Sequence, residues 1–425
     1  MVHIHADTPD IQNILKDMTQ IVQNNGGKLN EHIAITCEDG ELSLEFDGPA
    51  KQNEKIIEIP DKLLIPIKHL HASLKDNQFA INPNTEKLST AQISLAEHII
   101  TLYNYSGKAK WQRDNCPWIT LRPYKDIIQL LFKGRSKSDL KDTHIAFLQQ
   151  DKDAQEEDDF ICDSFLRTRV IGHRQSSEDK AEQKIMPIVD FMNHHLDGCP
   201  FNFAADKDGT NMLYILNKQP LAHSREFFAF YNRLDAFDSY LSYYFIDQTP
   251  HFVRSIPTTL QIDDIGTIDI KTKAGVLKLN DLPEQLKDLR GFMPQLHKNK
   301  DGHMVISHLM ITNHPSPHAM RRILRVLIGN LSDWTLSHNK LCKIIVKAER
   351  DIINQNIAYY KDLLQCIAQY QATDHQIALA PLKDLCNLQI TKLYRYHFDD
   401  QFFGRQYGRD IATLNLNKET EKQIA

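Results

Sequence analysis

Two short segments carry the side chains that could do chemistry. The first is a run of apolar residues, 187–192, interrupted by Asp190 and followed by the polar pair Asn193-His194. The second, 225–245, gathers phenylalanines, tyrosines and serines and ends in two tyrosines and a phenylalanine. An Asn-His pair at the end of a buried strand commonly satisfies backbone groups. Beside so many aromatic residues, the same pair could supply the few polar contacts of an otherwise apolar ligand pocket.

Both segments resemble motifs of the SET-domain protein methyltransferases, most closely the Rubisco large-subunit methyltransferase-like group. The first resembles the family's Asp-x-x-Asn-His motif. This implies that Asp190, Asn193 and His194 line an S-adenosylmethionine pocket, the last two holding the adenine. The second resembles a Tyr-Gly followed by a Tyr-Gly-Phe, so that Tyr231 would line the active site and Tyr243 would be the catalytic tyrosine. Asparagine and tyrosine replace the two glycines of that pattern.

Two further parts of the cofactor pocket follow from the resemblance. Related chains carry an arginine near the cofactor carboxylate, for which Arg169 is the best fit and Arg167 the alternative. A guanidinium suits a carboxylate because it can donate two parallel hydrogen bonds. The family's Gly-x-Gly loop, near the methionine end of the cofactor, corresponds here to the single Gly40, with Asp47-Gly48 as the second choice. This shortened loop bears on cofactor affinity more than on the fold.

The chemistry of such a site sets requirements that the residues can meet. Methyl transfer from a sulfonium to an amine needs a neutral amine, in line with the methyl carbon, in a channel that excludes water. Because the ordinary lysine pKa is about 10.4, an apolar channel favours the neutral form. We expect Phe228 and Phe230 to line this channel with Tyr231, and Tyr243 to orient the amine. The related histidine methyltransferases depart from the pattern at that tyrosine, so lysine is the favoured acceptor.

The composition is that of an ordinary globular protein with 425 residues, 41% of them hydrophobic and 25% charged. A net charge of -5 gives no general attraction to nucleic acid or anionic membranes. Seven cysteines without a Cys-x-x-Cys pair argue against a disulfide framework or a structural zinc site. The 20 histidines show no recognised ligand spacing, so we expect exposed or capping side chains and no metal site, even in the cluster His297, His303, His308, His314 and His318.

The N-terminus carries no signal-peptide pattern, and the apolar runs are far shorter than a membrane span. These features predict an intracellular protein, cytoplasmic or nuclear. Export by a route that needs no signal peptide is compatible with the same composition. We expect a monomer that binds a protein substrate and has no nucleic-acid or membrane partner.

The elements around the motifs predict an α+β fold. Helical spacing indicates a helix over Pro9 to Val22, and Asp39-Gly40 is a hairpin signal. The expected strands are 33–37, 42–46, 56–59, 212–216, 227–231, 260–262 and 268–270. Helical pieces fill the chain to about 159 and return from about 283, including a long helix opened by Ser332 or Asp333.

The resemblance turns this pattern into a SET-type mixed β fold, split by a helical insertion and followed by an all-α C-terminal domain. The five expected parts are an N-terminal helix, the N-terminal SET strands, the helical insertion, the C-terminal SET segment with both motifs, and the helical substrate-binding domain. Their ranges are 1–27, 28–62, 63–159, 160–255 and 256–425.

The function that the resemblance implies is S-adenosylmethionine-dependent N-methylation of a lysine in a non-histone protein, with the C-terminal helical domain binding the substrate. The shortened glycine loop leaves open a SET-fold binding module with weak or no catalysis. A protein-histidine methyltransferase is the other alternative. The sequence names neither the substrate protein nor the degree of methylation.

Overall fold

The computed structural model describes residues 2–46, 48–135, 154–173, 181–218, 225–262, 265–271, 295–299, 303–307, 309–312 and 319–413. The chain forms two compact units, each made of two separate segments. The first unit comprises residues 1–119 and 149–233, and the second comprises 120–148 and 234–425. Strands and helices occur in both, which confirms the α+β class. The division into five parts stays a prediction.

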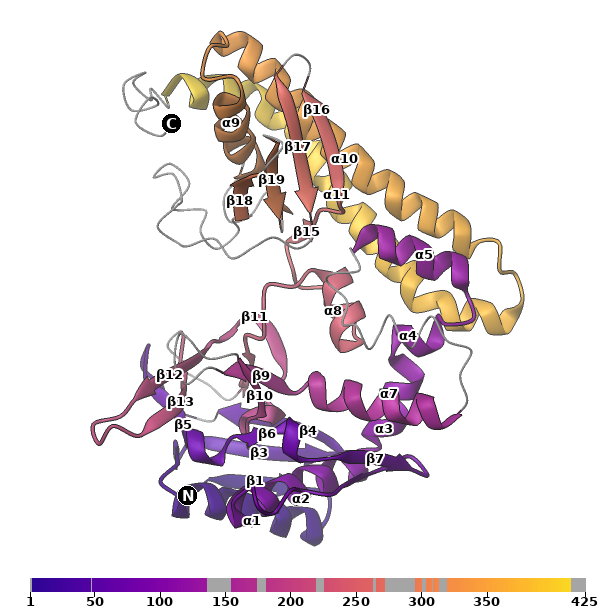
Figure 1. Cartoon of the computed structure of the whole chain (residues 1–425). Helices are drawn as coiled ribbons and strands as arrows, with labels where there is room; N and C mark the ends of the chain where they lie inside the picture. Colours follow the sequence, from indigo (N-terminus) through magenta and orange to yellow (C-terminus); the bar gives the residue numbers. More distant parts are fainter. Residues whose placement is uncertain are drawn as a thin grey trace. The chain divides into compact units, whose positions relative to one another are not determined.

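Among the described residues of the first unit the strands form four small sheets, with orders β1-β3-β4-β14, β6-β10-β9, β12-β13-β5-β2 and β7-β8; most of these strands are labelled in Figure 1. Their strands are β1 His3–Ala6, β2 Lys28–Leu29, β3 Ile33–Glu38, β4 Glu41–Phe46, β5 Lys55–Pro60, β6 Ile65–Pro66, β7 Ala72–Lys75, β8 Gln78–Ile81, β9 Val170–His173, β10 Glu182–Ile185, β11 His194–Cys199, β12 Phe201–Ala205, β13 Asn211–Leu216 and β14 Arg225–Glu226. The predicted strands at 33–37, 42–46, 56–59 and 212–216 are therefore confirmed.

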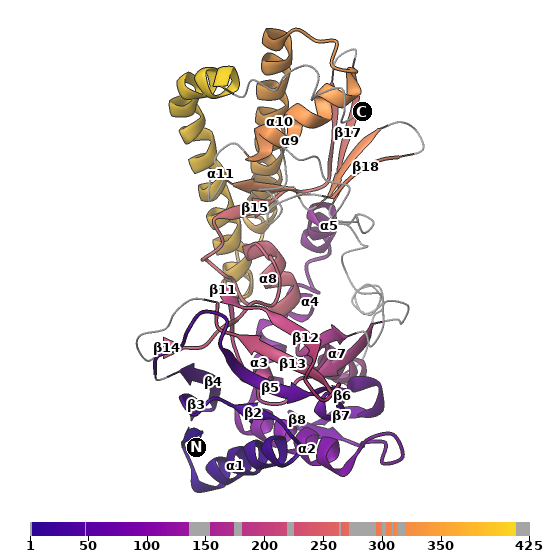
Figure 2. The ribbon, with the colours of Figure 1, turned by 90° about the vertical axis from the view of Figure 1, so that its left-hand side faces the viewer.

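The helices of the first unit follow from local signals. Thr8 caps α1, which has proline at its start, and Ser89 and Gln92 form a reciprocal capping box on α2. Helices α1 and α2 pack side by side (Figure 2), and α1 also contacts strand β1. The helices are α1 Pro9–Asn24, α2 Thr90–Tyr105, α3 Lys108–Asn115, α4 Pro117–Thr120, which ends in the second unit, and α7 Ala154–Arg167, with short 3-10 turns η1 Asp61–Leu63, η2 Ile67–His69 and η4 Val189–Phe191.

One apolar core holds these elements together. It joins α1 and α2 to the strands of the first two sheets through fully buried side chains such as Leu15, Ile35, Phe46 and Leu95. Strands β3 and β4 both contribute side chains to this core. Their hairpin turns at Asp39-Gly40, whose φ angles of 52° and 79° suit a two-residue hairpin turn. The predicted hairpin is therefore confirmed.

The second unit combines helices with two sheets, β16-β17-β19-β18 and β15-β20. Its helices are α5 Lys125–Gly134, α8 Ala236–Tyr243, α9 Ala319–Leu331, α10 His338–Ile367 and α11 Thr373–Thr413. Its strands are β15 Phe252–Arg254, β16 Thr258–Ile262, β17 Gly266–Lys271, β18 Gln295–Lys298, β19 Met304–Ser307 and β20 Met310–Thr312.

The C-terminal region is helical from Ala319 onward, but the expectation of an all-α domain from 256 needs correction. Four strands precede the helices there as one sheet, in which β17 pairs with β19 in parallel register. The predicted segments 260–262 and 268–270 are the adjacent strands of that sheet. The start expected for the helices near 283 lies outside the described residues.

Two other expectations about elements are wrong. The long helix α10 begins later than predicted, with Ser337 at its N-cap position, because Asp333 and Trp334 adopt positive φ angles of 48° and 56° that an α-helix does not allow. Within the range 63–159, which the sequence predicts as helical, β7 and β8 form a hairpin. Short paired strands give little local signal there, because their partners decide the conformation.

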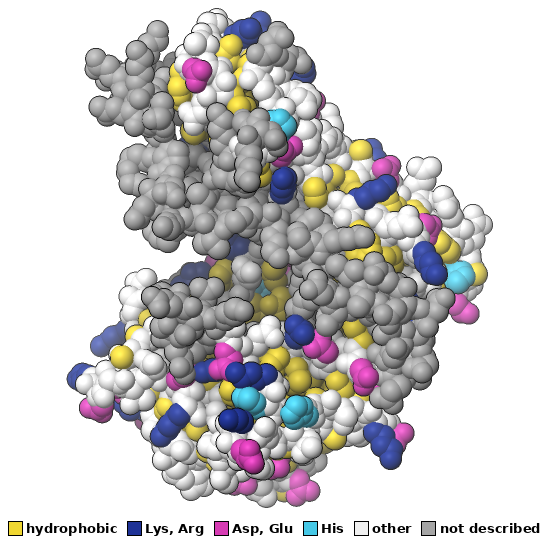
Figure 3. All heavy atoms as spheres, in the orientation of Figure 1, with side chains coloured by type: hydrophobic (Ala, Val, Ile, Leu, Met, Phe, Trp, Pro, Cys, Tyr) yellow, Lys and Arg dark blue, Asp and Glu magenta, His cyan; other side chains and the backbone are white. Residues whose placement is uncertain are grey.

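The described part of the chain holds no helix long and apolar enough to cross a membrane. On the face shown in Figure 3, acidic and basic side chains lie interspersed over the described surface.

Candidate functional site

Asp190 is fixed by a strained turn at the start of the predicted cofactor segment. Ile188 has φ 66° and ψ −50°, and the Val189 N–H donates to the Pro187 carbonyl at 2.7 Å, which is a γ-turn. A positive φ is costly for a β-branched residue, and such strain concentrates at functional sites. The turn leads into η4 and leaves the Asp190 side chain buried.

Asp190 forms a buried polar cluster with Tyr103 and Arg169. Its Oδ2 accepts hydrogen bonds from the Tyr103 hydroxyl at 2.8 Å and from Arg169 Nη1 at 3.3 Å. The guanidinium of Arg169 also donates to the Tyr103 hydroxyl and lies 3.7 Å from the centre of the Tyr103 ring. Burial raises the pKa of Asp190 and outweighs the opposing charge of Arg169. We call these three residues the Asp190 cluster.

The structure distinguishes the two candidate arginines. Arg169, just after α7, joins the Asp190 cluster, as described. Arg167 Nε instead donates to Asp163 Oδ1 at 2.6 Å, one turn back on the same helix, in a half-buried pair. That one of them binds a cofactor carboxylate stays a prediction. Of the two arginines, Arg169 is the one with a described contact to the Asp-x-x-Asn-His segment.

Asn193 and His194 bind backbone N–H groups of Ala229 and Tyr231, respectively. The Asn193 carbonyl accepts from the Ala229 N–H at 2.9 Å, and His194 Nδ1 accepts from the Tyr231 N–H at 3.2 Å. The rings of His194 and Tyr231 lie 5.1 Å apart. The Tyr231 hydroxyl donates to the Met192 carbonyl at 2.6 Å. The Asn-His segment and the Tyr231 part of the second motif therefore meet in the first unit.

The predicted strand at 227–231 is wrong, because this stretch changes partners along its length. The Phe227 N–H donates to the Leu44 carbonyl of β4, whereas the Ala229 N–H donates to the Asn193 carbonyl. Within 225–231, only the two residues of β14 form a ladder with β4. A local hydrophobic pattern cannot reveal such an exchange of partners.

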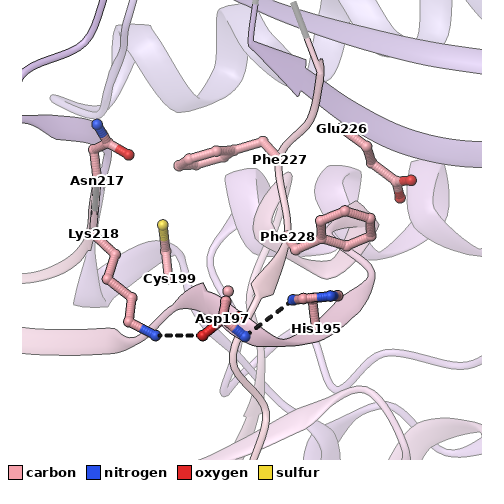
Figure 4. A pocket seen from close by; sticks show the side chains of 9 residues that line it. His195, Asp197, Cys199, Asn217, Lys218, Glu226, Phe227 and Phe228 are labelled. Atoms are coloured by element: carbon pink, nitrogen blue, oxygen red, sulfur yellow. Dashed lines mark hydrogen bonds and ion pairs between the residues drawn. The ribbon is translucent and has the colours of Figure 1, made fainter. Parts of the chain in front are cut away.

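A pocket of about 300 Å³ borders this segment in the first unit (Figure 4). At its edge Asn193 Nδ2 donates to Glu226 Oε1 at 2.6 Å. Phe228, predicted to line a channel, lies in the wall beside His195, with 5.3 Å between the ring centres. The lining residues are His195, Asp197, Gly198, Cys199, Asn217, Lys218, Glu226, Phe227 and Phe228.

Phe230 and Gly40 lie elsewhere. The Phe230 ring is 6.2 Å from that of His194, outside the set that lines the pocket. Gly40 sits at the tip of the β3-β4 hairpin, where its N–H donates to Asp7 Oδ2 at 3.0 Å. A Cβ added to Gly40 would lie 3.1 Å from Ser106 Cα, so the hairpin packs closely on the end of α2. The second choice is only partly described, because Asp47 lies outside the described residues.

Tyr243 belongs to the second unit, on the last turn of α8, and the two units are not placed relative to each other. Burial raises the pKa of Tyr243, so its hydroxyl stays protonated at neutral pH. Tyr244 follows with φ 70° and closes the helix in a left-handed conformation that favours glycine. This residue replaces a glycine of the family pattern.

Tyr103 and Glu226 are site residues that sequence reasoning missed. Tyr103 lies among the apolar residues of α2, and no spacing separates its hydroxyl from ordinary core packing. Lys108 lies three residues before Trp111. This spacing could have indicated a cation over an aromatic ring, which the structure shows.

Nothing among the described residues gathers three or more His, Cys, Asp or Glu side chains in a metal-binding arrangement. His308, His314 and His318 lie outside the described residues. His303 is described, and its Nδ1 lies 3.5 Å from Asp269 Oδ2.

The comparisons with known proteins give a structural likeness only. No protein-family model matches the chain, and no curated protein matches it in sequence. The SET domain of LSMT bound to lysine and AdoHcy is similar over 98% of this chain and 99% of that chain, with a TM-score of 0.41 at 12% identity. Rubisco LSMT bound to AdoMet is similar over 97% and 99%, with a TM-score of 0.40 at 11% identity. At such values no residue role or activity follows from the likeness.

Proposed function

We propose that this protein is an S-adenosylmethionine-dependent protein N-methyltransferase that acts on a lysine of a non-histone protein. The observation that carries the proposal is the arrangement around the segment Asp190–His194. Its start contacts Arg169 in the Asp190 cluster, its end holds Tyr231, and Asn193 borders the pocket through Glu226. Of these residues, the sequence motifs select all but Glu226.

The described residues fit the proposed cofactor at both of its ends. A cationic side chain suits the methionine carboxylate, and Arg169 has a buried Nε with no hydrogen-bond partner among the described residues. Aromatic rings, a carboxylate and an amide suit adenine, and Phe228, Glu226 and Asn217 offer them in the pocket. The pocket volume of about 300 Å³ lies at the lower end of the range for small-molecule sites, roughly 300–1,000 Å³.

The chemistry then assigns a task to each residue of the chain. Bound S-adenosylmethionine would supply an activated methyl group. Arg169, Asn193 and His194 would hold it, and Tyr231, whose hydroxyl is bonded to the Met192 carbonyl, would form a fixed wall that excludes water. Tyr243, with its protonated hydroxyl, would orient the acceptor amine.

The substrate side of the proposal is a monomer whose C-terminal helical region binds the protein substrate. Helices α9, α10 and α11 would supply the surface for that purpose. Lysine is favoured as acceptor because the chain keeps a tyrosine at the predicted catalytic position.

Calorimetric titration with S-adenosylmethionine is the first test, and we expect saturable binding at one site. Transfer of a labelled methyl group to proteins of a cell lysate then tests catalysis. Acid hydrolysis of the labelled product is expected to release methyl-lysine, and methyl-histidine would contradict the acceptor. Absence of heat at high cofactor concentration would contradict the enzyme itself.

A second candidate is a binding module of the same fold without catalysis. The observation that favours it is the hairpin at Gly40, whose N–H is already bonded to Asp7. A backbone group engaged in this way cannot also donate to a cofactor. Protein binding in pull-down experiments, together with no cofactor binding in the titration, would support this candidate.

A further inference from the structure

Helix α8, which ends at the proposed catalytic Tyr243, begins at a buried carboxylate that several donors bind. Asp235 is the N-cap residue, and its Oδ1 accepts from the Asp238 N–H at 2.8 Å. Its Oδ2 accepts from the Arg254 N–H at 2.8 Å, and Arg135 Nη2 lies 3.1 Å from Oδ1 and 3.2 Å from Oδ2. These groups already cap the helix and supply a positive charge to the carboxylate.

Helix α11 adds one more donor to this carboxylate. Gln389 Nε2 donates to Asp235 Oδ2 at 3.1 Å, and both side chains are fully buried. The two residues lie 154 positions apart in the chain, and α11 packs against α8 in the second unit. Gln389 therefore joins the start of the helix that carries Tyr243 to the C-terminal helix.

The amide of Gln389 is only partly satisfied in this position. Its Oε1 is buried and has no hydrogen-bond partner among the described residues. A buried carbonyl without a donor costs at least as much free energy as one amide hydrogen bond typically contributes. An apolar side chain of similar size would therefore keep α11 packed without a loss of stability. What the amide adds is a directional link between α11 and α8.

We propose that Gln389 is a positioning residue for Tyr243, acting through Asp235 and α8. This role rests on the proposed methyltransferase function. Helix α8 has eight residues and is about 12 Å long, so a tilt about its N-cap displaces its last residue most. A displacement of about 1 Å at a reacting group can cost about 10²-fold in rate. Because α11 belongs to the region proposed to bind the protein substrate, the same bond would fix Tyr243 relative to that substrate.

A double-mutant cycle tests this role with the full chain. The initial rate of labelled-methyl transfer to a fixed amount of lysate protein is measured at saturating S-adenosylmethionine for wild type, Gln389→Met, Tyr243→Phe and the double variant. Methionine keeps the length of the glutamine side chain and removes its N–H donor. The control is Leu379→Ala in both backgrounds, because Leu379 is buried earlier on the same helix. Denaturant unfolding gives the stability of each variant.

Gln389→Met is expected to lower the rate about 10–100-fold without lowering the free energy of unfolding. In the Tyr243→Phe background it should change the rate by less than about twofold, because the hydroxyl that it positions is absent. Leu379→Ala should lower the free energy of unfolding and leave both rates unchanged where the variants remain folded.

Three results would overturn the role of Gln389 and leave the enzyme proposal intact. They are an unchanged rate for Gln389→Met, an equal loss of rate in both backgrounds, and a loss of rate that accompanies a loss of folding. The absence of both transfer and cofactor binding in wild type would overturn both proposals.

Discussion

At the residue scale, the decisive group is the Asp190 carboxylate, because it turns Arg169 inward. Without a buried carboxylate to bind, a guanidinium near a helix end would remain at the surface, as Arg167 does in its pair with Asp163. The same cluster brings Tyr103 into contact from α2. A candidate cofactor arginine is thus held by residues distant in sequence.

Tyr243 gives a prediction of catalysis at this scale. Tyr243→Phe is expected to lower kcat by about 10²–10³-fold, as loss of one positioned hydroxyl group does, while cofactor binding is unchanged. Labelled-methyl transfer and calorimetry measure the two quantities. Tyr240→Phe on the same helix is the control and is expected to remain active. Unchanged transfer by Tyr243→Phe would remove Tyr243 from the mechanism.

Lys108 gives a prediction of pH dependence. Its pKa falls from an ordinary 10.5 to about 7 in the folded chain, so the unfolded state binds the proton first as pH decreases. As the pH decreases from about 10.5 to about 7, protonation of Lys108 should therefore lower the free energy of unfolding. Below pH 7 Lys108 should cause no further change in it. Denaturant unfolding should show Lys108→Met gaining stability relative to wild type as pH decreases through this window. A difference independent of pH, as expected for Lys110→Met, would contradict it.

At the element scale, the β3-β4 hairpin has the single Gly40 where the family pattern has Gly-x-Gly. Its turn needs positive φ at both residues, and its tip packs on the end of α2. The N–H groups of Asp39 and Gly40 both donate to Asp7, at 3.0 Å each. The hairpin is therefore tied to the fold itself, whatever it contributes to a cofactor.

A matched pair of glycines separates these effects. Gly40→Ala is expected to lower the free energy of unfolding by more than the roughly 1–2 kcal/mol that a left-handed alanine costs, because its Cβ would also crowd Ser106. Gly209→Ala has nearly the same φ, 80° against 79°, and open space around it, so it should show the backbone cost alone. Denaturant unfolding measures both. Equal losses would show that the contact with Ser106 does not matter.

At the scale of the whole molecule, each unit is assembled from two distant segments of chain. In the second unit a buried ion network joins them, since Arg135 from the segment 120–148 pairs with Asp238 at 2.7 Å and Asp235 at 3.1 Å. Arg254 Nη1 also contacts Asp238, at 3.0 Å. Burial acts to raise the pKa of Asp238, but Arg135 and Arg254 outweigh it and lower the pKa to about 2.

Breaking this network should destabilise the second unit. Asp238→Ala leaves Arg135 with one buried carboxylate fewer and is expected to cost about 3–5 kcal/mol of unfolding free energy. Asp362→Ala, at an exposed position of α10, should cost little. Chemical denaturation measures both variants. A small loss for Asp238→Ala would mean that the two segments are held together mainly by apolar packing.

The sequence by itself determined the elements whose signals are local. The spacing of Ile11, Leu15 and Met18 places α1, and Asp39-Gly40 places the hairpin turn, because helix faces and two-residue turns depend on neighbouring residues. It also selected the segment Asp190–His194 and, separately, Arg169 through motif resemblance. The described helices and strands follow these signals at both places.

Only the tertiary structure decided which distant groups meet. The convergence of Tyr103 and Arg169 on Asp190, the bond between Asn193 and Glu226, and the sheet before α9 all depend on contacts between remote segments. Such contacts leave no periodic trace in the sequence, because burial and partner, rather than the neighbouring residue, fix the conformation and charge state of each group.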